Sequence, residues 1–189
     1  EINGPWQVRF DPQWGGPAEP VTFDTLQDWS KHSDKGIRYY SGTASYQKTF
    51  HLASSKLSQS IPILLDMDKT EVMARVRVNG HKCGIAWKAP YRIDISSAVQ
   101  SGENKLEIEV VNLWFNRMIG DERQYPEDCE WIDWEILEGW PEWFRNEDFP
   151  RPTGRYTFTT AKHYEKDDPL YPSGLLEPVR IVVPVNDNL

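Results

Sequence analysis

The sequence predicts an all-β protein, an antiparallel β-sandwich that carries one long irregular insertion. Three observations predict this fold. Short stretches of alternating apolar and polar residues recur through the first 114 residues, and alternation with a period of two indicates strands with one buried face. Turn sequences separate the stretches, and Asn79-Gly80 is the strongest hairpin signal among them. Few segments have helical periodicity, and several short strands joined by turns are typical of sandwiches and barrels.

Seven stretches have the strand pattern and are expected to pair in two antiparallel sheets. The sequence MARVRVN, for example, alternates small apolar residues with arginine before its Asn-Gly turn. In the last stretch Pro184 suits a sheet edge or a strand end, because proline donates no hydrogen bond. The predicted strands are residues 6–10, 43–50, 61–67, 73–79, 91–95, 105–114 and 179–185. Helix is expected at 23–31, where Asp24 can cap, and a less regular helical pattern covers 130–137.

Residues 115–178 have little strand character, and the segment is too long for an ordinary loop. We therefore expect an ordered insertion with a functional or packing role, within a single domain spanning residues 1–189. Between Asp121 and Asp148 the insertion has 11 acidic residues against two arginines, and it holds four of the nine tryptophans. Those tryptophans supply apolar area for its order.

Composition makes two classes of partner unfavourable. The net charge is −8, most of it in the insertion, and both nucleic acid and anionic membranes require clusters of Lys and Arg. No apolar run approaches the ~20 residues that span a bilayer, and no signal peptide is readable at Glu1. Cys83 and Cys129 lack the CxxC spacing of zinc and redox motifs, and the sequence leaves open whether they pair.

The stretch VVNLWFNRMIGDE, residues 110–122, ends a strand in a cluster of polar residues. If Leu106, Ile108 and Val110 face the core, Asn112 also points inward, and a buried amide needs hydrogen-bond partners. Two interpretations stay open, an internal clamp for the segment that follows and a ligand site. We favour the clamp, since ligand residues lie more often on loops. Its predicted members are Asn112, Asn116, Arg117 and Asp121, with Trp114 packed beside them.

Aromatic residues provide a second candidate site. Sugar-binding pockets combine apolar walls with a few polar groups, and a carbohydrate platform could be built from Trp87, Tyr91, Arg92 and Trp114. The alternative is that the same side chains pack the insertion onto the sandwich, because bulky aromatic residues serve cores and interfaces alike. The sequence does not decide between them.

No catalytic residue is assigned. Glycoside hydrolysis requires two carboxylates about 5–10 Å apart, and residues 121–148 hold enough acids to supply such a pair by chance. A solvated acidic face is the favoured interpretation of that segment. The four histidines are scattered, and the GxSxG, HExxH, P-loop and dinucleotide motifs are all missing.

Four segments resemble the C-terminal region of glycoside hydrolase family 106, the α-L-rhamnosidases. The specific ones are NLWFNRMIGDE, residues 112–122, and PSGLLEPV, residues 172–179. The four segments are residues 41–50, 74–95, 101–122 and 154–181. The middle of the chain is also similar, more loosely, to the jelly-roll, galactose-binding-like domains of family 2 glycosidases.

The resemblance implies a galactose-binding-like β-sandwich within a larger enzyme whose catalytic carboxylates lie in another domain. The expected function is a non-catalytic accessory domain that binds carbohydrate weakly or supports the catalytic domain, in a periplasmic or secreted protein. The expected partners are therefore a carbohydrate or the catalytic domain of the same polypeptide. A structural Ca²⁺ is a candidate cofactor, although DMDKTE, residues 66–71, lacks the glycine and final glutamate of an EF-hand loop. The alternative function is a free-standing carbohydrate-active hydrolase that uses carboxylates of residues 121–148.

Overall fold

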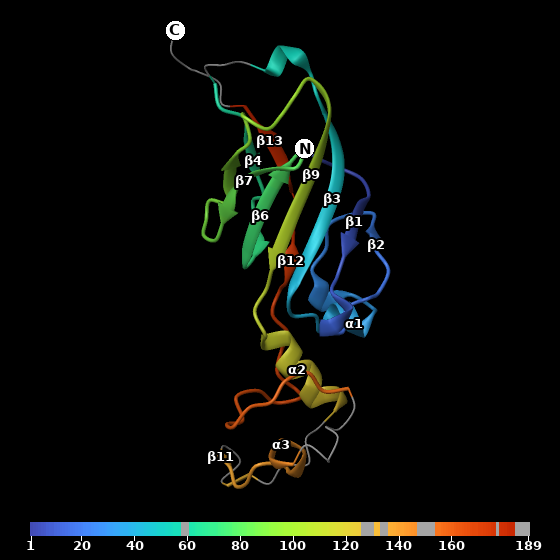
Figure 1. Ribbon diagram of the computed structural model, residues 1–189, viewed down its shortest axis with the longest axis vertical. Coiled ribbons are helices and arrows are strands. Elements are labelled where there is room, and N and C mark those ends of the chain that lie inside the picture. The colour runs from blue at the N-terminus through green and yellow to red at the C-terminus, as the bar shows by residue number, and fades with distance from the viewer. Residues whose placement is uncertain (58–60, 126–130, 133–135, 147–153, 177, 184–189) are drawn as a thin grey trace.

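The protein is long, with a β-sandwich at one end and the helices α2 (Phe115–Gln124) and α3 (Glu142–Arg145) at the other, as the computed structural model shows (Figure 1). The structure describes residues 1–57, 61–125, 131–132, 136–146, 154–176 and 178–183. Among these residues, none of the helices has the length and apolar content that crossing a bilayer requires.

One layer of the sandwich is a six-stranded sheet in which every neighbouring pair is antiparallel. Its strands, in spatial order, are β2 (Val21–Phe23), β1 (Trp6–Arg9), β3 (Thr43–Leu52), β9 (Gly102–Val111), β6 (Met73–Val78) and β7 (His81–Ala86). The longest pairing joins β3 to β9 over their full length.

The second layer lies behind the first in Figure 1 and consists of two smaller antiparallel sheets. One has the order β13 (Arg180–Val182), β4 (Leu64–Asp66) and β8 (Arg92–Asp94), and the other pairs β12 (Gly174–Leu175) with β5 (Thr70–Glu71). The prediction of an antiparallel β-sandwich is confirmed, and each of the seven predicted strands overlaps a strand of the structure.

The remaining elements are short, except α2. They are the helices α1 (Lys35–Arg38), α2 (Phe115–Gln124) and α3 (Glu142–Arg145), the hairpin β10 (Trp131–Ile132) and β11 (Ile136–Leu137), and the 3₁₀ turns Pro12–Trp14, Trp29–Lys31 and Ser54–Lys56.

The helix expected at 23–31 is wrong. Residues 21–23 form the edge strand β2, whose Phe23 pairs with Trp6 of β1. A 3₁₀ turn follows, capped by the Asp28 carboxylate, which accepts a hydrogen bond from the Ser30 N–H at 3.0 Å. Pairing with a neighbouring strand has overridden local helical pattern. The helix expected at 130–137 is wrong in its described part, where Trp131–Ile132 and Ile136–Leu137 pair as β10 and β11; residues 130 and 133–135 lie outside the described residues.

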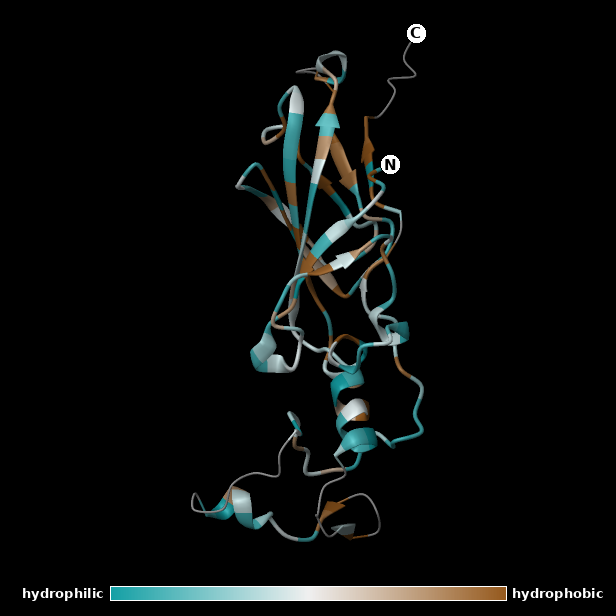
Figure 2. Ribbon diagram, turned by 90° about the vertical axis from the view of Figure 1, so that its right-hand side faces the viewer, coloured by the Kyte–Doolittle hydropathy of each residue, from teal (hydrophilic) through white to brown (hydrophobic). Residues whose placement is uncertain are grey.

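Residues 115–178 were expected to form an irregular insertion with a helical pattern only at 130–137, and this is wrong at their start, where the helix α2 runs for 10 residues. The sequence hides this helix because its buried face is mostly polar and contains a glycine. Figure 2 accordingly shows α2 as largely hydrophilic, in contrast with the strands of the sandwich. The buried residues of α2 are Asn116, Arg117, Ile119, Gly120 and Asp121.

The core between the layers is rich in aromatic rings. The indole of Trp29 stacks on the ring of Tyr46 at 6.3 Å, and Phe10 contacts both Trp29 and Tyr40 edge-on. The Tyr46 hydroxyl is buried and accepts hydrogen bonds from Trp29 Nε1 at 2.6 Å and from the Leu175 N–H at 3.2 Å. Burial raises the pKa of Tyr46, against the smaller opposing effect of these two donors. The hydroxyl therefore links the two layers as a neutral acceptor.

Tyr46→Phe is expected to lower the free energy of unfolding by about 1–3 kcal/mol, because it leaves the Trp29 indole N–H and the Leu175 N–H buried without an acceptor. Denaturant unfolding measures the change. Tyr91→Phe is the control, because the Tyr91 hydroxyl has no hydrogen-bond partner among the described residues. Equal stability of the two variants would contradict the role assigned to Tyr46.

Gly120→Ala is expected to destabilise the fold even though alanine is the better helix former by about 1 kcal/mol. A Cβ at position 120 would lie 2.5 Å from Cγ of Tyr39, and overpacking of this kind costs about 1–3 kcal/mol. Thermal melting should show a loss for Gly120→Ala and little change for Gly139→Ala, where a Cβ meets nothing within 4 Å. A gain in melting temperature at position 120 would show that α2 does not pack on Tyr39.

Candidate functional site

Asn112 lies between the end of β9 and the start of α2 and is 8% exposed. Its Nδ2 donates to the carbonyl of Tyr40 at 2.7 Å, and its Oδ1 accepts from the Gly42 N–H at 3.0 Å. The side-chain amide therefore donates one hydrogen bond to the backbone of residues 40–42 and accepts one from it, as the backbone of a neighbouring strand does. The inward orientation expected from strand parity is what the structure shows.

Asn116, in the first turn of α2, binds a different segment in the same way. Its Oδ1 accepts from the Tyr171 N–H at 2.8 Å, and its Nδ2 donates to the Tyr171 carbonyl at 2.7 Å. A further contact joins Nδ2 to Ser173 Oγ at 3.2 Å. Backbone groups of an irregular segment need such partners once they are removed from water.

Asp121, two turns from the start of α2, is fully buried. Its Oδ2 accepts hydrogen bonds from the Tyr156 N–H at 2.9 Å, the Thr157 N–H at 2.7 Å and the Thr157 hydroxyl at 2.8 Å. Hydrogen bonds to an ionised acceptor are about twice as strong as neutral ones. One carboxylate thus fixes the chain where it returns toward the sandwich.

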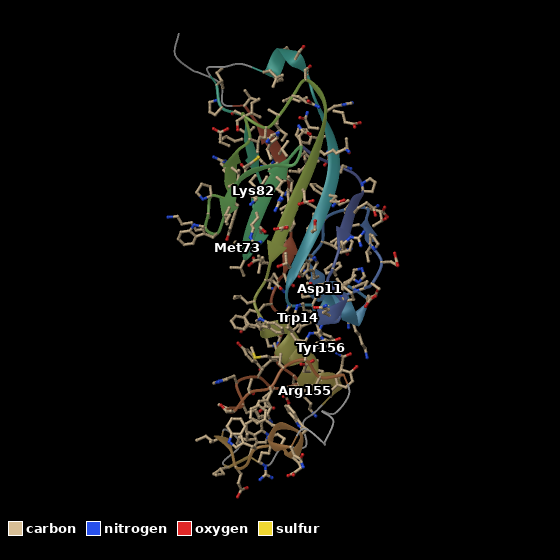
Figure 3. The ribbon with its side chains drawn as sticks, viewed as in Figure 1. Asp11, Trp14, Met73, Lys82, Arg155 and Tyr156 are labelled. Atoms are coloured by element: carbon tan, nitrogen blue, oxygen red, sulfur yellow. The ribbon has the colours of Figure 1, made fainter. Side chains whose placement is uncertain are left out.

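Arg117 is the buried cation beside this carboxylate. Its Nη1 lies 3.7 Å from Asp121 Oδ1, its Nη2 donates to the Trp14 carbonyl at 3.5 Å, and its guanidinium lies 4.7 Å from the centre of the Tyr156 ring. Burial lowers the pKa of Arg117, and the nearby Asp121 carboxylate opposes this shift. Figure 3 shows Trp14 and Tyr156 close together where the sandwich meets α2.

We call Asn112, Asn116, Arg117 and Asp121 the α2 hub. Arg117 and Asp121 contact each other, and the four side chains together connect residues 14, 40–42, 156–157 and 171–173 to residues 112–121. Most polar atoms of these side chains are engaged by the protein itself, although Arg117 Nε and Asp121 Oδ1 are buried without a hydrogen-bond partner among the described residues. This arrangement favours the clamp over the ligand site, and its contribution to stability stays a prediction.

The four residues of the expected aromatic platform are used differently. Trp87 is 65% exposed in the loop after β7, with the Lys88 ammonium 5.3 Å from its ring. Tyr91 packs at the margin of the core, and Arg92 Nε donates to Asp66 Oδ2 at 2.8 Å. Trp114 lies at the start of α2, where its ring meets Trp14 edge-on at 5.2 Å. The structure therefore places Trp114 at the junction with α2, apart from the β7–β8 loop.

The described residues contain no group of three or more His, Cys, Asp or Glu side chains placed to hold a metal ion. In the 66–71 turn, Asp66 Oδ1 accepts from the Asp68 N–H at 3.0 Å and Oδ2 pairs with Arg92. Both oxygens of this carboxylate therefore have protein partners, and the proposed Ca²⁺ gains no ligand set there.

Three of the four described carboxylates of residues 121–148 also have structural partners. Asp121 is enclosed by its three donors, Glu122 Oε1 pairs with Arg155 at 2.5 Å, and Glu142 Oε2 pairs with Arg145 at 2.8 Å. Glu138 is the fourth described acid. The remaining acids lie outside the described residues: Glu127, Asp128, Glu130, Asp133, Glu135, Glu147 and Asp148.

A hollow of about 690 Å³ lies on the outer face of the six-stranded sheet, and it was not predicted from the sequence. Outward-facing residues of the strand pattern form much of its lining, and they were the signal that could have predicted it. The hollow is lined by Pro5, Gln7, Gln47, Lys48, Thr49, Arg77, Gly80, Lys105, Leu106 and Glu107.

Comparison with known proteins finds similarity to glycosidases along the chain. Residues 27–138 match the family described as glycosyl hydrolase 2 galactose-binding domain-like. A protein of Formosa agariphila, provisionally named a beta-glucuronidase, is 44% identical over 193 residues, which cover all of this chain and 16% of that protein. The chain thus spans about a sixth of this relative.

Two solved structures extend the comparison. A rhamnosidase from Novosphingobium sp. PP1Y is 35% identical, with a TM-score of 0.76, over 95% of this chain and 14% of its own. A β-glucuronidase from Ruminococcus gnavus matches 59% of this chain and 21% of its own at 22% identity, with a TM-score of 0.51. The second likeness concerns the fold alone.

Asp121→Ala is expected to be the most destabilising change in the α2 hub. It removes the acceptor of three buried donors and leaves the Arg117 cation without its carboxylate, and breaking a buried ion pair costs about 3–5 kcal/mol. The melting temperature should fall by roughly 6–15 °C for a chain of this length. Arg117→Ala leaves Asp121 its three donors and should cost less, roughly 2–10 °C.

The control is Asp167→Ala, because Asp167 is an exposed carboxylate. If Asp121→Ala and Arg117→Ala both have the melting temperature of the control, the α2 hub is not a clamp. The ligand interpretation of residues 112–121 would then be favoured.

Proposed function

The chain belongs to the glycosyl hydrolase 2 galactose-binding domain-like family, and on this premise we propose that it is a non-catalytic accessory domain of a larger, α-L-rhamnosidase-type glycoside hydrolase. The proposal rests on how small a share of each relative's length this chain matches. The rhamnosidase structure matches 95% of this chain but only 14% of its own length, and the Formosa relative shares the whole chain over 16% of its own. In both relatives the matched part is a small share of a much longer protein.

The buried polar groups support a structural role for residues 110–122. The α2 hub connects four distant parts of the chain by hydrogen bonds and an ion pair, as a rigid scaffold requires. A clamped end of this kind holds its surface in one shape, and preorganised surfaces lose less entropy on association.

The proposed contact with the rest of the hydrolase lies where the sandwich meets α2. Trp14 and Trp114 form an edge-on pair there and are 42% and 40% exposed. Trp140 and Phe144 stack at 4.7 Å beyond α2 and are 47% and 54% exposed. Exposed aromatic residues of this kind are enriched in interfaces between proteins and domains.

The alternative is a free-standing hydrolase that uses carboxylates of residues 121–148. The partners of Asp121, Glu122 and Glu142 weigh against it, because a catalytic pair must reach opposite sides of a glycosidic bond. The names of the relatives suggest the assay substrates, an aryl α-L-rhamnoside and an aryl β-D-glucuronide. The chain alone should hydrolyse neither. Turnover that is abolished by a carboxylate-to-amide change within residues 121–148 would establish the alternative.

A domain exchange tests the accessory role directly. In the Novosphingobium rhamnosidase the segment matched by this chain is deleted in one variant and replaced by this chain in a second. The deletion should lose activity and melt at a lower temperature, whereas the replacement should recover a measurable part of both. The role in support is wrong if the deletion variant keeps full activity and stability.

A matched control locates the contact. The same replacement carrying Trp14→Ala and Trp114→Ala removes the exposed pair at the junction. It should recover less activity than the unchanged replacement if this pair meets the catalytic part. Equal recovery of activity by the two replacements would indicate that the contact lies on another surface.

A further inference from the structure

The outer face of the six-stranded sheet is turned toward the viewer in Figure 1, and its hollow lies over β1, β3, β9 and β6. Of these strands, β3, β9 and β6 form the two longest pairings of the protein among the described residues. Side chains on such strands are held in fixed positions, so the hollow is a preformed surface. Its volume of about 690 Å³ lies within the range of about 300–1,000 Å³ typical of ligand sites.

One row of polar side chains crosses the sheet through this hollow. In the strand register Gln7 is opposite Gln47, Gln47 is opposite Glu107, and Glu107 is opposite Arg77. Gln47 Nε2 donates to Glu107 Oε2 at 3.4 Å, and Arg77 Nε lies 3.6 Å from Glu107 Oε1. Gln7 Nε2 is anchored at the edge by Thr22 Oγ1 at 2.8 Å.

The row offers the chemistry that sugar hydroxyls need. Each glutamine presents a carbonyl oxygen, and each amide nitrogen has a second hydrogen beyond the one used within the row. Carboxylate and guanidinium groups add acceptors and donors of greater strength. Among the described residues that line the hollow, none has an aromatic ring, so binding here depends on hydrogen bonds and charge.

The charge of the hollow is opposite to that of the chain. Lys48, Arg77 and Lys105 line it against one carboxylate, that of Glu107, whereas the whole protein has a net charge of −8. Arg77 and Gln47 already engage Glu107, and Lys48 Nζ donates to the Pro5 carbonyl at 2.9 Å. Lys105 is exposed at the rim. A hollow with more cationic than anionic side chains attracts anions.

We propose that this hollow binds an anionic oligosaccharide, in which carboxylate or sulfate groups pair with Lys105 and Arg77 while Gln7 and Gln47 bind ring hydroxyls. Protein docking is less suited to this face, because the centres of protein interfaces are depleted in charge. The exposed Trp14–Trp114 pair lies at the α2 end of the molecule, so the site is independent of the accessory contact. The proposal therefore goes beyond the proposed function and does not require it.

The test titrates the chain with three oligosaccharide series of equal length: oligogalacturonates with carboxylates, carrageenan oligomers with sulfates, and neutral galacto-oligosaccharides. Calorimetry gives the affinities, and amide chemical-shift changes locate the site. At least one anionic series should bind at least about tenfold more tightly than the neutral series. The shift changes should fall on β1, β3, β6 and β9, and binding should weaken as salt rises. Which anionic series binds tells carboxylate from sulfate recognition.

Lys105→Gln removes one exposed charge from the rim, and its ammonium makes no hydrogen bond recorded among the described residues. It should weaken anionic binding about two- to fivefold, the size expected for an exposed ion pair, and Lys105→Glu should weaken it further. Both variants should melt like the parent. Lys31→Gln, an exposed lysine outside the hollow, is the charge-matched control and should leave affinity unchanged.

Three results would overturn the proposal. They are failure of both anionic series to bind, affinity equal to that of the neutral series, and shift changes that map to residues outside the hollow. None of these results bears on the domain exchange in the rhamnosidase, so failure of this site and failure of the accessory role are distinguishable.

Discussion

The constraint on which the rest of the structure depends is the burial of the Asp121 carboxylate. An ionised group removed from water must be paired and hydrogen-bonded, or it costs several kcal/mol. Asp121 meets this demand by drawing the backbone of residues 156–157 and the Arg117 guanidinium onto α2. Two asparagines satisfy the same demand for backbone groups on either side, at residues 40–42 and at residue 171. The end of the sandwich is thus closed by polar contacts instead of an apolar core.

This constraint also explains which parts of the fold were predictable from the sequence. Strands such as 73–79 and 105–114 alternate apolar and polar residues, and the sheet buries the apolar set, so their pattern sufficed. The buried face of α2 consists mostly of Asn, Arg, Gly and Asp, and no hydrophobic periodicity indicates such a helix. The strand β2 was missed for a related reason, since three residues at a sheet edge are specified by their partner β1 more than by their own sequence.

The candidate site was predictable to a similar degree. Strand parity placed Asn112 inward, and the spacing of Arg117 and Asp121 suggested their contact. The partners of these residues lie 35 to 103 positions away in the chain, and only the fold brings them together. The aromatic platform was inferred from residue types alone. In the structure β9 ends at Val111, and Trp114 lies at the start of α2 beside Trp14, apart from Trp87. The sheet hollow went unnoticed, since curvature and register determine it.

Polar residues therefore serve two purposes in this domain. Those at the end of β9 and on α2 face inward and are engaged by the chain, whereas those on the outer sheet face remain open to a ligand. The central claim is that the inward set is architectural, and native-state hydrogen exchange tests it most directly. The amides of Tyr156, Thr157 and Tyr171, which donate to Asp121 and Asn116, should be protected to nearly the same free energy as the amides at the centre of β9. Exchange of these three amides at the rate of an exposed loop, while β9 stays protected, would contradict the account.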